Sequence, residues 1–361
     1  MLLLEWRLKI ICLSLLGAGL SSAVTADNKT TPELAQPVNQ ALCAAAAKPE
    51  SYRGTFLKNF KTLQKGRQDW LFRDMDLKRA YGPRAPGYKS LQRLQRLLQS
   101  RGTTLVMVPI PGRALVHPEY LGDIHYDVQR GRRAYSDYLQ KLRAIDIVVP
   151  QIDSLFQQTQ TKPLFFARDH HWNHHGARTI ARLTGYAIKA RQIPGIERQR
   201  FTSSNVGADH NDGSLQRAAL ELCDQRYPKE PFKLYQTVAV SDDFSNDLSN
   251  DLSNDLSNDL SNDLFGELPE PQIVLVGTSN SRGQLGFNFH GFLAHYARAS
   301  VNNKAKSGAG FGGALKDYLT SDRFRQSPPK VLVWEIPGYY SLNEPSFFDD
   351  LVLGLEVQPS T

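Results

Sequence analysis

Apolar residues recur at two spacings in the first half of this chain. Between residues 88 and 100, leucines at positions 91, 94, 97 and 98 lie on one face of a helix, and Gly102 follows as an end signal. The next stretch, 103–108, is rich in β-branched and apolar residues and stops at Pro109. The pattern therefore predicts a helix followed directly by a buried strand.

The same alternation continues towards the carboxyl end. The further elements expected are helices at 132–143 and 177–190, and strands at 146–149, 272–276 and 330–335. Residues 199–240 give no secondary-structure prediction, because they contain turn formers and few periodic apolar positions. Strands separated by helices favour parallel pairing, with helices covering the sheet. The chain is therefore predicted to form one α/β domain with a mainly parallel sheet, over residues 27–361.

The amino-terminal residues have a different character. Two basic residues, Arg7 and Lys9, precede an apolar run at 10–20, and a small-x-small sequence ends at Ala26. The apolar run is about half of the roughly 20 residues that a membrane helix needs. We therefore interpret residues 1–26 as a cleavable signal peptide of an exported protein.

Residues 245–264 are five tandem copies of Ser-Asn-Asp-Leu. Only one residue in four is apolar, and Ser, Asn and Asp are poor helix formers. We interpret this low-complexity stretch as a flexible, acidic surface insertion. Calcium binding is the alternative, since Asp and Asn supply oxygen ligands, but the stretch lacks the glycine-rich turns of known calcium repeats.

Net charge narrows the range of partners. The chain carries 43 Lys and Arg against 36 Asp and Glu, a formal charge of +7, even though the repeat is acidic. Nucleic acid is not the usual partner of an exported protein, so an anionic polymer or membrane surface fits the charge better. A basic surface without such a partner is the alternative.

Three cysteines are present, and Cys12 falls within the signal peptide. Cys43 and Cys223 would then remain as a pair in an oxidising compartment, which favours one disulfide between them. It would tie the amino-terminal segment to the region beyond residue 200. Two buried free thiols are the alternative.

A histidine-rich stretch at 169–175 contains Asp169 and four histidines. This composition is typical of a metal site or of the base of a nucleophilic enzyme. On a helix, histidines four positions apart, such as His171 and His175, would share a face and could ligate zinc. No Glu stands between them as in a metalloprotease, so we predict neither a metal nor another cofactor.

Ser279 supplies a partner for the nucleophilic alternative. It follows the apolar run 272–276 and Gly277, where a buried strand is expected to end and a helix to begin. Ligands of open α/β sheets bind at the carboxyl ends of strands, and a helix start offers free N–H groups for an oxyanion. His171 would take the proton of Ser279, and Asp169, on the same side of an extended segment, would orient the imidazole.

The histidine-rich motif and the serine motif occur in a fixed order along the chain. Asp-x-His-Trp at 169–172 is followed by Gly-Ala, and Gly-Thr-Ser-x-Ser comes later, at 277–281. They are accompanied by Asp-Trp-Leu-Phe at 69–72, a Pro-x-Pro region at 105–118, the glycine stretch 308–313 and Val-Trp-Glu-Ile-Pro at 333–337. Together these sequences resemble the alginate O-acetyltransferases of the AlgX/AlgJ kind over most of the chain.

The resemblance implies an SGNH-hydrolase-like domain of three layers, in which Asp-x-His precedes the serine, a permuted order relative to other SGNH hydrolases. It implies that Ser279 is the nucleophile, His171 the base and Asp169 the orienting acid. The family also has a structural disulfide, which agrees with a pairing of Cys43 and Cys223.

Two features depart from the family pattern. AlgX-like proteins carry a carboxyl-terminal carbohydrate-binding module, and the sequence is expected to lack one because it stops at Thr361. In this respect it resembles AlgJ or a shortened relative of AlgX. The 245–264 insertion is the second departure.

The implied activity is transfer of acetyl, through an acetyl-serine, to hydroxyls of an anionic exopolysaccharide in the periplasm, with the mannuronate residues of alginate as the favoured acceptor. A membrane O-acyltransferase system would deliver the acetyl donor, alongside other periplasmic polysaccharide-export proteins. Oxyanion donors are expected at the backbone of Ser279 and of Gly308 or Gly310. The residues expected near the substrate or the base are Arg113, Arg282, Arg298 and Trp172.

Two other functions fit the same residues. With water as the acceptor, the triad would make a carbohydrate acetylesterase. Without catalysis, the chain would be a polysaccharide-binding scaffold of an export complex. Acetyl on a uronic-acid oligomer would identify the transferase, free acetate alone the esterase, and acetylation unchanged by Ser279→Ala the scaffold.

Overall fold

Four parallel strands form the central sheet of the computed structural model, which describes residues 41–54, 56–158, 160–240, 272–282 and 287–356. Across the sheet their order is β3 (Thr104–Ile110), β8 (Val331–Pro337), β6 (Ile273–Val276) and β7 (Val301–Asn303). Every residue of β6 and β8 is buried, as expected for parallel strands covered on both faces. The predicted signal peptide and the 245–264 insertion lie outside the described residues.

The strand predicted at 146–149 is shorter than expected. Only Val148 pairs with the sheet, as a parallel bridge to Val106 of β3. Its N–H donates to Leu105 O and its carbonyl accepts from Met107 N–H. Pro150 follows shortly after, and proline cannot donate to a strand ladder, so the pairing ends.

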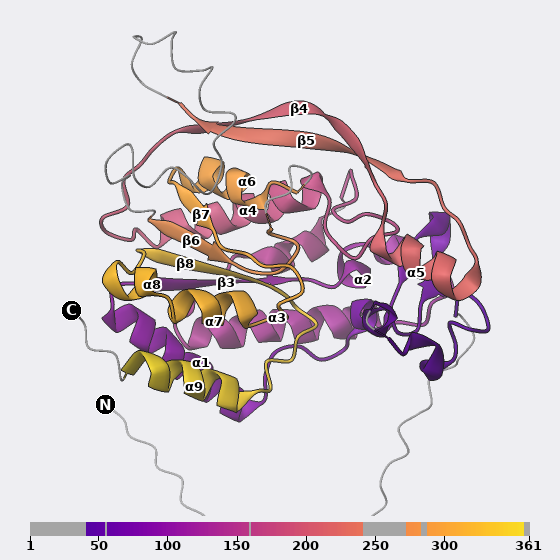
Figure 1. Ribbon diagram of the computed structural model, residues 1–361, viewed down its shortest axis with the longest axis horizontal. Helices are drawn as coiled ribbons and strands as arrows, with labels where there is room; N and C mark the ends of the chain where they lie inside the picture. The colour runs from indigo at the N-terminus through magenta and orange to yellow at the C-terminus, as the bar shows by residue number, and fades with distance from the viewer. Residues whose placement is uncertain (1–40, 55, 159, 241–271, 283–286, 357–361) are drawn as a thin grey trace, which may run out of the picture. The chain divides into compact units, whose positions relative to one another are not determined.

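Helices cover both faces of the sheet. Figure 1 places α4 (His174–Ala190) and α6 (Phe289–Ala297) on one side, and α1 (Ala85–Ser100), α3 (Val128–Ala144), α7 (Gly313–Leu319) and α9 (Pro345–Glu356) on the other. Leu91, Leu94 and Leu98 of α1 are fully buried, so the predicted apolar face is the one that packs inward. This three-layer arrangement confirms the predicted α/β fold class.

The remaining elements near the sheet are short. They are α2 (Arg113–Val116), α8 (Asp322–Gln326), the antiparallel pair β1 (Gln64–Lys65) and β2 (Leu71–Phe72), and 3-10 helices at Pro49–Tyr52, Leu57–Asn59, Arg67–Asp69, Asp74–Leu77, Pro118–Tyr120 and Ile152–Gln157. No helix among the described residues is both long enough and apolar enough to cross a bilayer.

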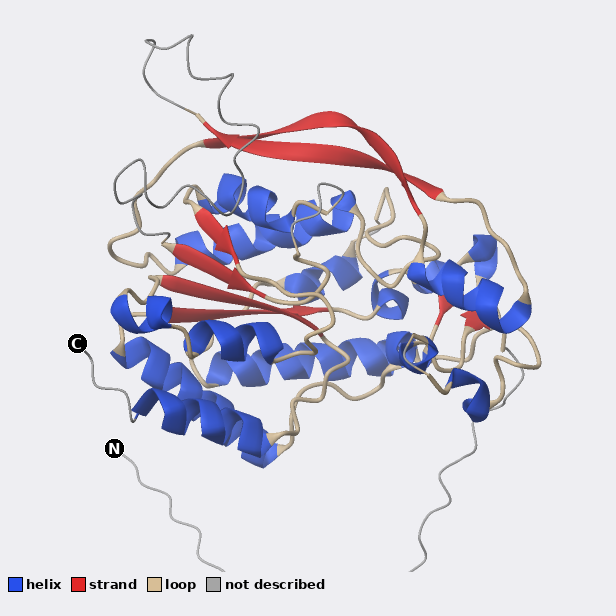
Figure 2. Ribbon diagram, viewed as in Figure 1, coloured by secondary structure: helices blue, strands red, loops and turns tan. Residues whose placement is uncertain are grey.

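A long antiparallel ribbon occupies the region that the sequence pattern left open. Its strands are β4 (Phe201–Asn211) and β5 (Glu230–Ala239), with α5 (Ser214–Cys223) between them. Figure 2 shows the ribbon beside the layer formed by α4 and α6. Its residues are half-buried or exposed, none fully buried, which explains why no apolar periodicity marks these strands.

The predicted disulfide between Cys43 and Cys223 is present, with 5.8 Å between the two Cα atoms. It joins the amino-terminal segment to the last residue of α5. A small separate core surrounds it, to which the segment contributes Tyr52 and Phe60 and the helix Leu215 and Ala219. The amino-terminal segment therefore supports α5 both covalently and by packing.

Candidate active site

The nucleophile turn, residues 277–281, follows β6 at the carboxyl edge of the sheet. Gly277 lies so close to the neighbouring strand that a Cβ there would come within 2.6 Å of Glu335 Oε2. Only glycine fits this position without displacing the carboxyl group. The turn thereby raises the partly exposed Ser279 above the end of the strand, as the sequence predicted.

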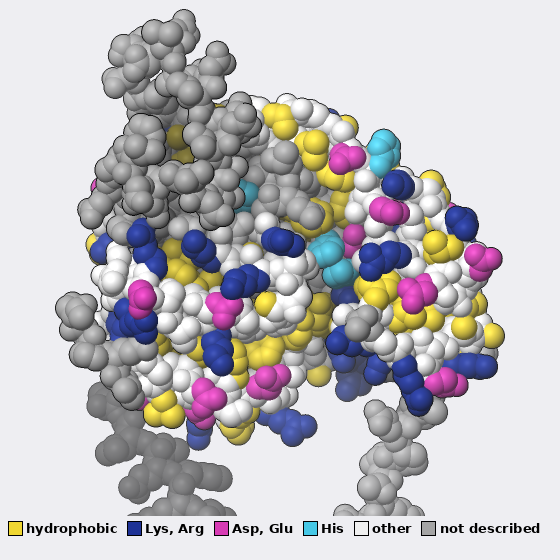
Figure 3. All heavy atoms as spheres, viewed as in Figure 1, with side chains coloured by type: hydrophobic (Ala, Val, Ile, Leu, Met, Phe, Trp, Pro, Cys, Tyr) yellow, Lys and Arg dark blue, Asp and Glu magenta, His cyan; other side chains and the backbone are white. Residues whose placement is uncertain are grey.

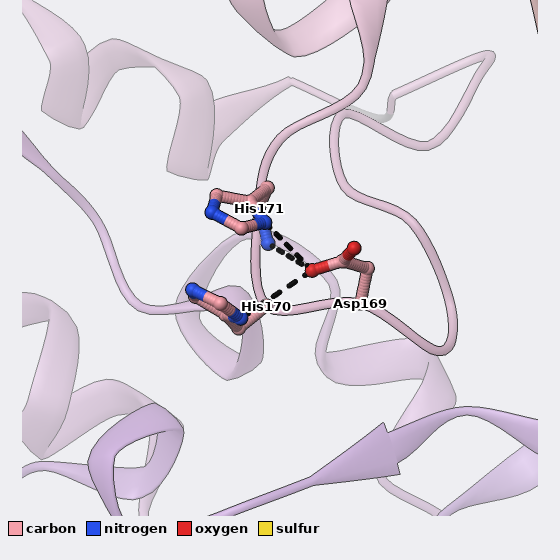
Figure 4. A group of neighbouring side chains, drawn as sticks. All are labelled: Asp169, His170 and His171. Atoms are coloured by element: carbon pink, nitrogen blue, oxygen red, sulfur yellow. Dashed lines mark hydrogen bonds and ion pairs between the residues drawn. The ribbon is translucent and has the colours of Figure 1, made fainter. Parts of the chain in front are cut away.

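The histidine segment, residues 165–172, is a loop rather than the extended stretch that we expected. Phe165 and Trp172 pair with each other as an antiparallel bridge, so the residues between them turn back. Asp169 and His171 nevertheless face one another in this loop, as Figure 4 shows. A turn in the backbone, and not the alternation of side chains along a strand, therefore brings Asp169 and His171 together.

The structure brings the three predicted catalytic side chains into one hydrogen-bonded row. His171 Nε2 lies 2.8 Å from Ser279 Oγ, and His171 Nδ1 lies 2.8 Å from Asp169 Oδ1. A carboxylate only accepts, so Nδ1 carries the proton and Nε2 is left to accept the hydroxyl proton. This is the geometry in which a serine can be activated.

Asp169 is buried and accepts hydrogen bonds from several directions. Its Oδ1 accepts from the His171 N–H at 3.1 Å and from Ser214 Oγ at 2.9 Å, and its Oδ2 accepts from Asn211 Nδ2 at 3.0 Å. Burial alone would raise the pKa of Asp169, but the adjacent His171, then His170 and Asn211, hold it well below its ordinary value. Asp169 is therefore a carboxylate at neutral pH.

Sequence reasoning missed both of these supporting residues. Asn211 ends β4 and Ser214 begins α5, 42 and 45 residues after Asp169. Asn and Ser at the ends of elements usually cap or turn the chain, and nothing in their spacing distinguishes these two. Only the path of the ribbon brings them to Asp169.

His170 belongs to the same cluster but faces Ser214. The Ser214 hydroxyl donates to Asp169, so its oxygen accepts from His170 Nδ1 at 2.6 Å. Burial, and then electrostatic interaction with His171 and Arg73, lower the pKa of His170 well below its ordinary value. A neutral His170 with its edge towards Phe60 supports the loop rather than transferring protons.

The cluster contains residue types that bind metal ions. One ligand atom each of Asp169, His170 and His171 lies within 4.8 Å of the others. All three side chains, however, already hydrogen bond within the cluster, and an ion between them would replace the bond that orients the imidazole. The histidine pairs considered for zinc do not share a helix face either, because α4 begins only at His174.

His174 and His175 form the first turn of α4. Their rings lie 3.9 Å apart, and His174 also contacts Tyr235 of the ribbon. Burial, and then His175 and Lys233, lower the pKa of His174 to about 4. Both histidines therefore belong to the packing between α4 and β5, and neither lies in the Ser279–His171–Asp169 row.

Trp172 connects the two catalytic segments. Its side chain is fully buried, and its Nε1 donates to Asn280 O at 2.9 Å. Asn280 follows Ser279 directly, so this bond ties the histidine segment to the nucleophile turn. Trp172 directly follows His171 in the chain, and its burial leaves it no face for a substrate.

The candidate arginines take up three different positions. Arg113 is buried and donates to the carbonyls of Leu71, Phe166 and Ala167, which places it beneath the histidine segment and out of reach of a polymer. Arg298 follows α6 just before β7 begins, and so lies at the opposite edge of the parallel sheet from Ser279. Arg282 alone is both exposed and near the turn, three residues after Ser279.

The glycine loop after β7 runs beside the nucleophile turn. Lys306 N–H donates to Gly277 O at 3.0 Å and anchors the loop there. Gly308 and Gly310 have φ values of 73° and 66°, in the left-handed region that glycine adopts without strain. The loop follows the carboxyl end of β7, at the same edge of the sheet as Ser279, and the role of the two glycines as oxyanion donors stays a prediction.

The three-layer α/β fold and the Ser-His-Asp row are those of an SGNH-hydrolase-like protein. The family described as "SGNH hydrolase-like domain, acetyltransferase AlgX" matches residues 63–338, and the chain belongs to this family. The predicted resemblance to AlgX and AlgJ is thereby confirmed.

Relatives and a solved structure agree with this assignment. The "Alginate biosynthesis protein AlgX" of Pseudomonas aeruginosa is 34% identical, over 94% of this chain and 70% of that protein. The "Probable alginate O-acetylase AlgJ" of the same species is 32% identical, over 76% of this chain and 69% of that protein. The solved structure of Pseudomonas aeruginosa AlgX superposes with a TM-score of 0.75 and 31% identity, over 88% of this chain and 71% of that chain.

Proposed function

We propose that this protein is an O-acetyltransferase that carries acetyl on Ser279 and transfers it to hydroxyls of an anionic exopolysaccharide, namely the mannuronate residues of alginate. The observation that carries the proposal is the 2.8 Å contact between His171 Nε2 and Ser279 Oγ, with Asp169 behind the imidazole. The names of the AlgX and AlgJ relatives supply the polymer and the acetyl group.

The first half-reaction forms the acetyl-serine. Ser279 Oγ attacks the carbonyl carbon of an acetyl donor while His171 Nε2 takes the hydroxyl proton. Asp169 stabilises the imidazolium that results. The tetrahedral intermediate collapses, the bond from the carbon to the leaving group breaks, and the leaving group takes the proton from His171.

The second half-reaction transfers the acetyl group. A sugar hydroxyl attacks the acetyl carbon of the ester, and His171 takes its proton. The bond to Ser279 Oγ then breaks, and the serine oxygen recovers that proton from His171. The serine and histidine end as they began, and one ester has replaced another.

Negative charge on the carbonyl oxygen needs donors in both steps. The Ser279 N–H is the first candidate, and the N–H of Gly308 or Gly310 in the adjacent loop is the second. Backbone donors held in place before the reaction stabilise such an oxyanion without reorganisation, and one of them is worth about 10²–10³-fold in kcat.

The charge of the molecule suits an anionic acceptor. Figure 3 shows histidine side chains near the middle of one face, with Lys and Arg side chains on both sides of them. A basic surface around a site raises the local concentration of a polyanion and steers its approach. Arg282, exposed beside the nucleophile turn, is the arginine we assign to a uronate carboxylate.

The proposal includes a place in the cell. Residues 1–26 would direct export, and residues 27–361, with the 245–264 insertion, would form one acetyltransferase domain in the periplasm. The acetyl donor would come from a membrane O-acyltransferase system, and other polysaccharide-export proteins would be neighbours. The sequence pattern of the amino-terminal residues supports this location.

Incubation of the purified protein with mannuronate oligomers and an activated acetyl ester tests the function. Acetylated oligomers, detected by mass spectrometry, are expected from the wild type and not from Ser279→Ala. Ser300→Ala, an exposed serine before β7, is the matched control and should behave as the wild type. Release of acetate with no acetylated oligomer would identify an esterase instead, and equal acetylation by Ser279→Ala would overturn the mechanism.

A further inference from the structure

A buried carboxyl group lies directly beneath the nucleophile turn. Glu335 belongs to β8, where it is paired in register with Val108 of β3 and follows the residue paired with Val276 of β6. Its side chain is fully buried, and it has no ion pair with any residue that the structure describes. Burying a carboxyl group without a cation costs free energy, so hydrogen bonds are expected to compensate for the loss of water.

The closest hydrogen bonds of the Glu335 side chain go to Thr278, the residue before the nucleophile, and the Ser281 hydroxyl is a further donor to it. Glu335 Oε2 accepts from the Thr278 N–H at 2.8 Å, and the Thr278 hydroxyl lies 3.0 Å and 3.1 Å from its two oxygens. The missing side chain of Gly277 makes room for this approach. One carboxyl group therefore fixes both the backbone and the side chain of Thr278.

The contacts continue across the turn to the base. Thr278 Oγ1 accepts from Asn280 N at 3.4 Å and from Asn280 Nδ2 at 3.3 Å. Asn280 O in turn accepts from Trp172 Nε1. Ser279 is thus held between two residues that are joined to each other, and the anchor of this network in the sheet is Glu335.

The direction of these bonds selects one ionisation state. A hydroxyl oxygen accepts two hydrogen bonds and donates one. Because Asn280 occupies the accepting positions of Thr278 Oγ1, its hydroxyl proton is left to donate to Glu335. A carboxylate accepts this bond together with those of the Thr278 N–H and the Ser281 hydroxyl, whereas a protonated carboxyl offers fewer accepting lone pairs and adds a donor of its own.

We propose that Glu335, as a carboxylate, is a positioning residue for acetyl transfer that sets the nucleophile turn through Thr278. The inference rests on the proposed function, since it concerns the same serine. It gives the site a proton equilibrium that lies outside the Ser279–His171–Asp169 row. The turn is set when Glu335 is ionised and loosens when Glu335 takes up a proton.

The electrostatic surroundings place this equilibrium near neutral pH. Burial raises the pKa of Glu335 to about 7, against the lowering effect of the Thr278 N–H bond. His171 and Tyr340 are its ionisable neighbours. Because the folded-state pKa lies above the ordinary value, protonation favours the folded state, and this stabilisation is lost as pH rises through about 7. The ionised form that the turn requires is therefore the less stable one.

Glu335→Gln separates positioning from mere packing. The amide keeps the shape and an acceptor for the Thr278 N–H, but it does not titrate. Like a protonated carboxyl it carries a donor of its own, so kcat/KM above pH 7 should also be lower than in the wild type. Hydrolysis of an activated acetyl ester, which needs only Ser279 acylation and water, is followed as kcat/KM against pH. The acid limb is expected to be steeper, by the one proton of Glu335, in the wild type than in Glu335→Gln. Thermal unfolding at pH 8 should occur at a higher temperature in the variant.

Two further variants and one control complete the test. Thr278→Val should lower kcat by roughly 10²-fold with little change in KM, the scale of a misplaced reacting group, and Thr278→Ser should restore most of it. Glu344→Gln, an exposed glutamate, should match the wild type. Equal slopes in the wild type and Glu335→Gln, with full activity in Thr278→Val, would overturn the inference, while ester hydrolysis that survives Ser279→Ala would instead overturn the proposed function.

Discussion

The nucleophile turn and the histidine segment meet at a hydrogen bond, yet they are supported in opposite ways. The nucleophile turn rests on the sheet itself, since β6 leads into it and Glu335 of the adjacent β8 holds Thr278 from below. The histidine segment is held from outside the sheet, by Asn211 and Ser214 at the junction of the ribbon and α5.

The two regions also differ in the pKa of the carboxyl group that each contains. Asp169 receives donors and lies beside histidines, so its pKa is held well below the ordinary value. Glu335 lies in the sheet and forms no ion pair within the part of the chain that the structure describes, and burial raises its pKa to about 7. Asp169 therefore stays charged at neutral pH, whereas Glu335 titrates near it, so of these two carboxyl groups only Glu335 is expected to respond to pH in this range.

Asp169→Asn tests the histidine segment most severely. The amide cannot favour the tautomer in which Nδ1 carries the proton, so Nε2 loses its role as a base. We expect kcat for acetyl-ester hydrolysis to fall by roughly 10⁴-fold with an unchanged fold. Steady-state kinetics with circular dichroism would measure this, and a loss below tenfold would remove Asp169 from the mechanism.

Removal of the disulfide tests whether the amino-terminal segment, through α5, helps to hold the histidine segment in place. The bond closes a loop of 180 residues and ties the amino-terminal segment to the end of α5. Cys43→Ser with Cys223→Ser should lower the free energy of unfolding by about 2–4 kcal/mol, measured by denaturant titration. The rate of ester hydrolysis should also fall, because Ser214, which donates to Asp169, lies at the other end of α5. Unchanged stability would show that the disulfide does not help to hold α5 and the histidine segment in place.

Ser214→Ala is the mildest change. It removes one donor to the Asp169 carboxylate, a kind of bond worth about 1.5–3 kcal/mol. We expect kcat to fall tenfold to a hundredfold, with KM little changed. Ser203→Ala is the matched control, because the Ser203 hydroxyl hydrogen bonds to Thr237 of the same ribbon, and its loss should leave the kinetics unchanged. Equal effects of the two changes would mean that the ribbon acts only through overall stability.

The same contrast explains what could be predicted from the sequence. The nucleophile turn was predictable because a buried strand, a glycine and a serine are consecutive, and short-range patterns record such geometry. The pairing of Asp169 with His171 was predictable from their spacing, although the loop that achieves it was not. The contacts of Asn211 and Ser214 with Asp169 could not be predicted, because β4 and β5, which bring them there, carry no apolar periodicity.

Glu335 was overlooked for a different reason. It lies inside an apolar strand whose pattern predicts only burial, and its partner Thr278 is 57 residues earlier in the chain. Arg113 was misplaced in the same way, since an arginine in sequence indicates a surface charge. Only its contacts to three carbonyls show that it braces the histidine segment from below.

The central claim is that Ser279 carries the acetyl group, and peptide mapping tests it directly. The protein is mixed briefly with an activated acetyl ester, quenched in acid and digested, and the acetylated peptide is sequenced by mass spectrometry. Acetyl is predicted on Ser279 in the wild type, with a larger fraction in the absence of an oligosaccharide acceptor than in its presence. Turnover of the ester with acetyl on another residue, or with none on Ser279 at any time of quenching, would contradict the account.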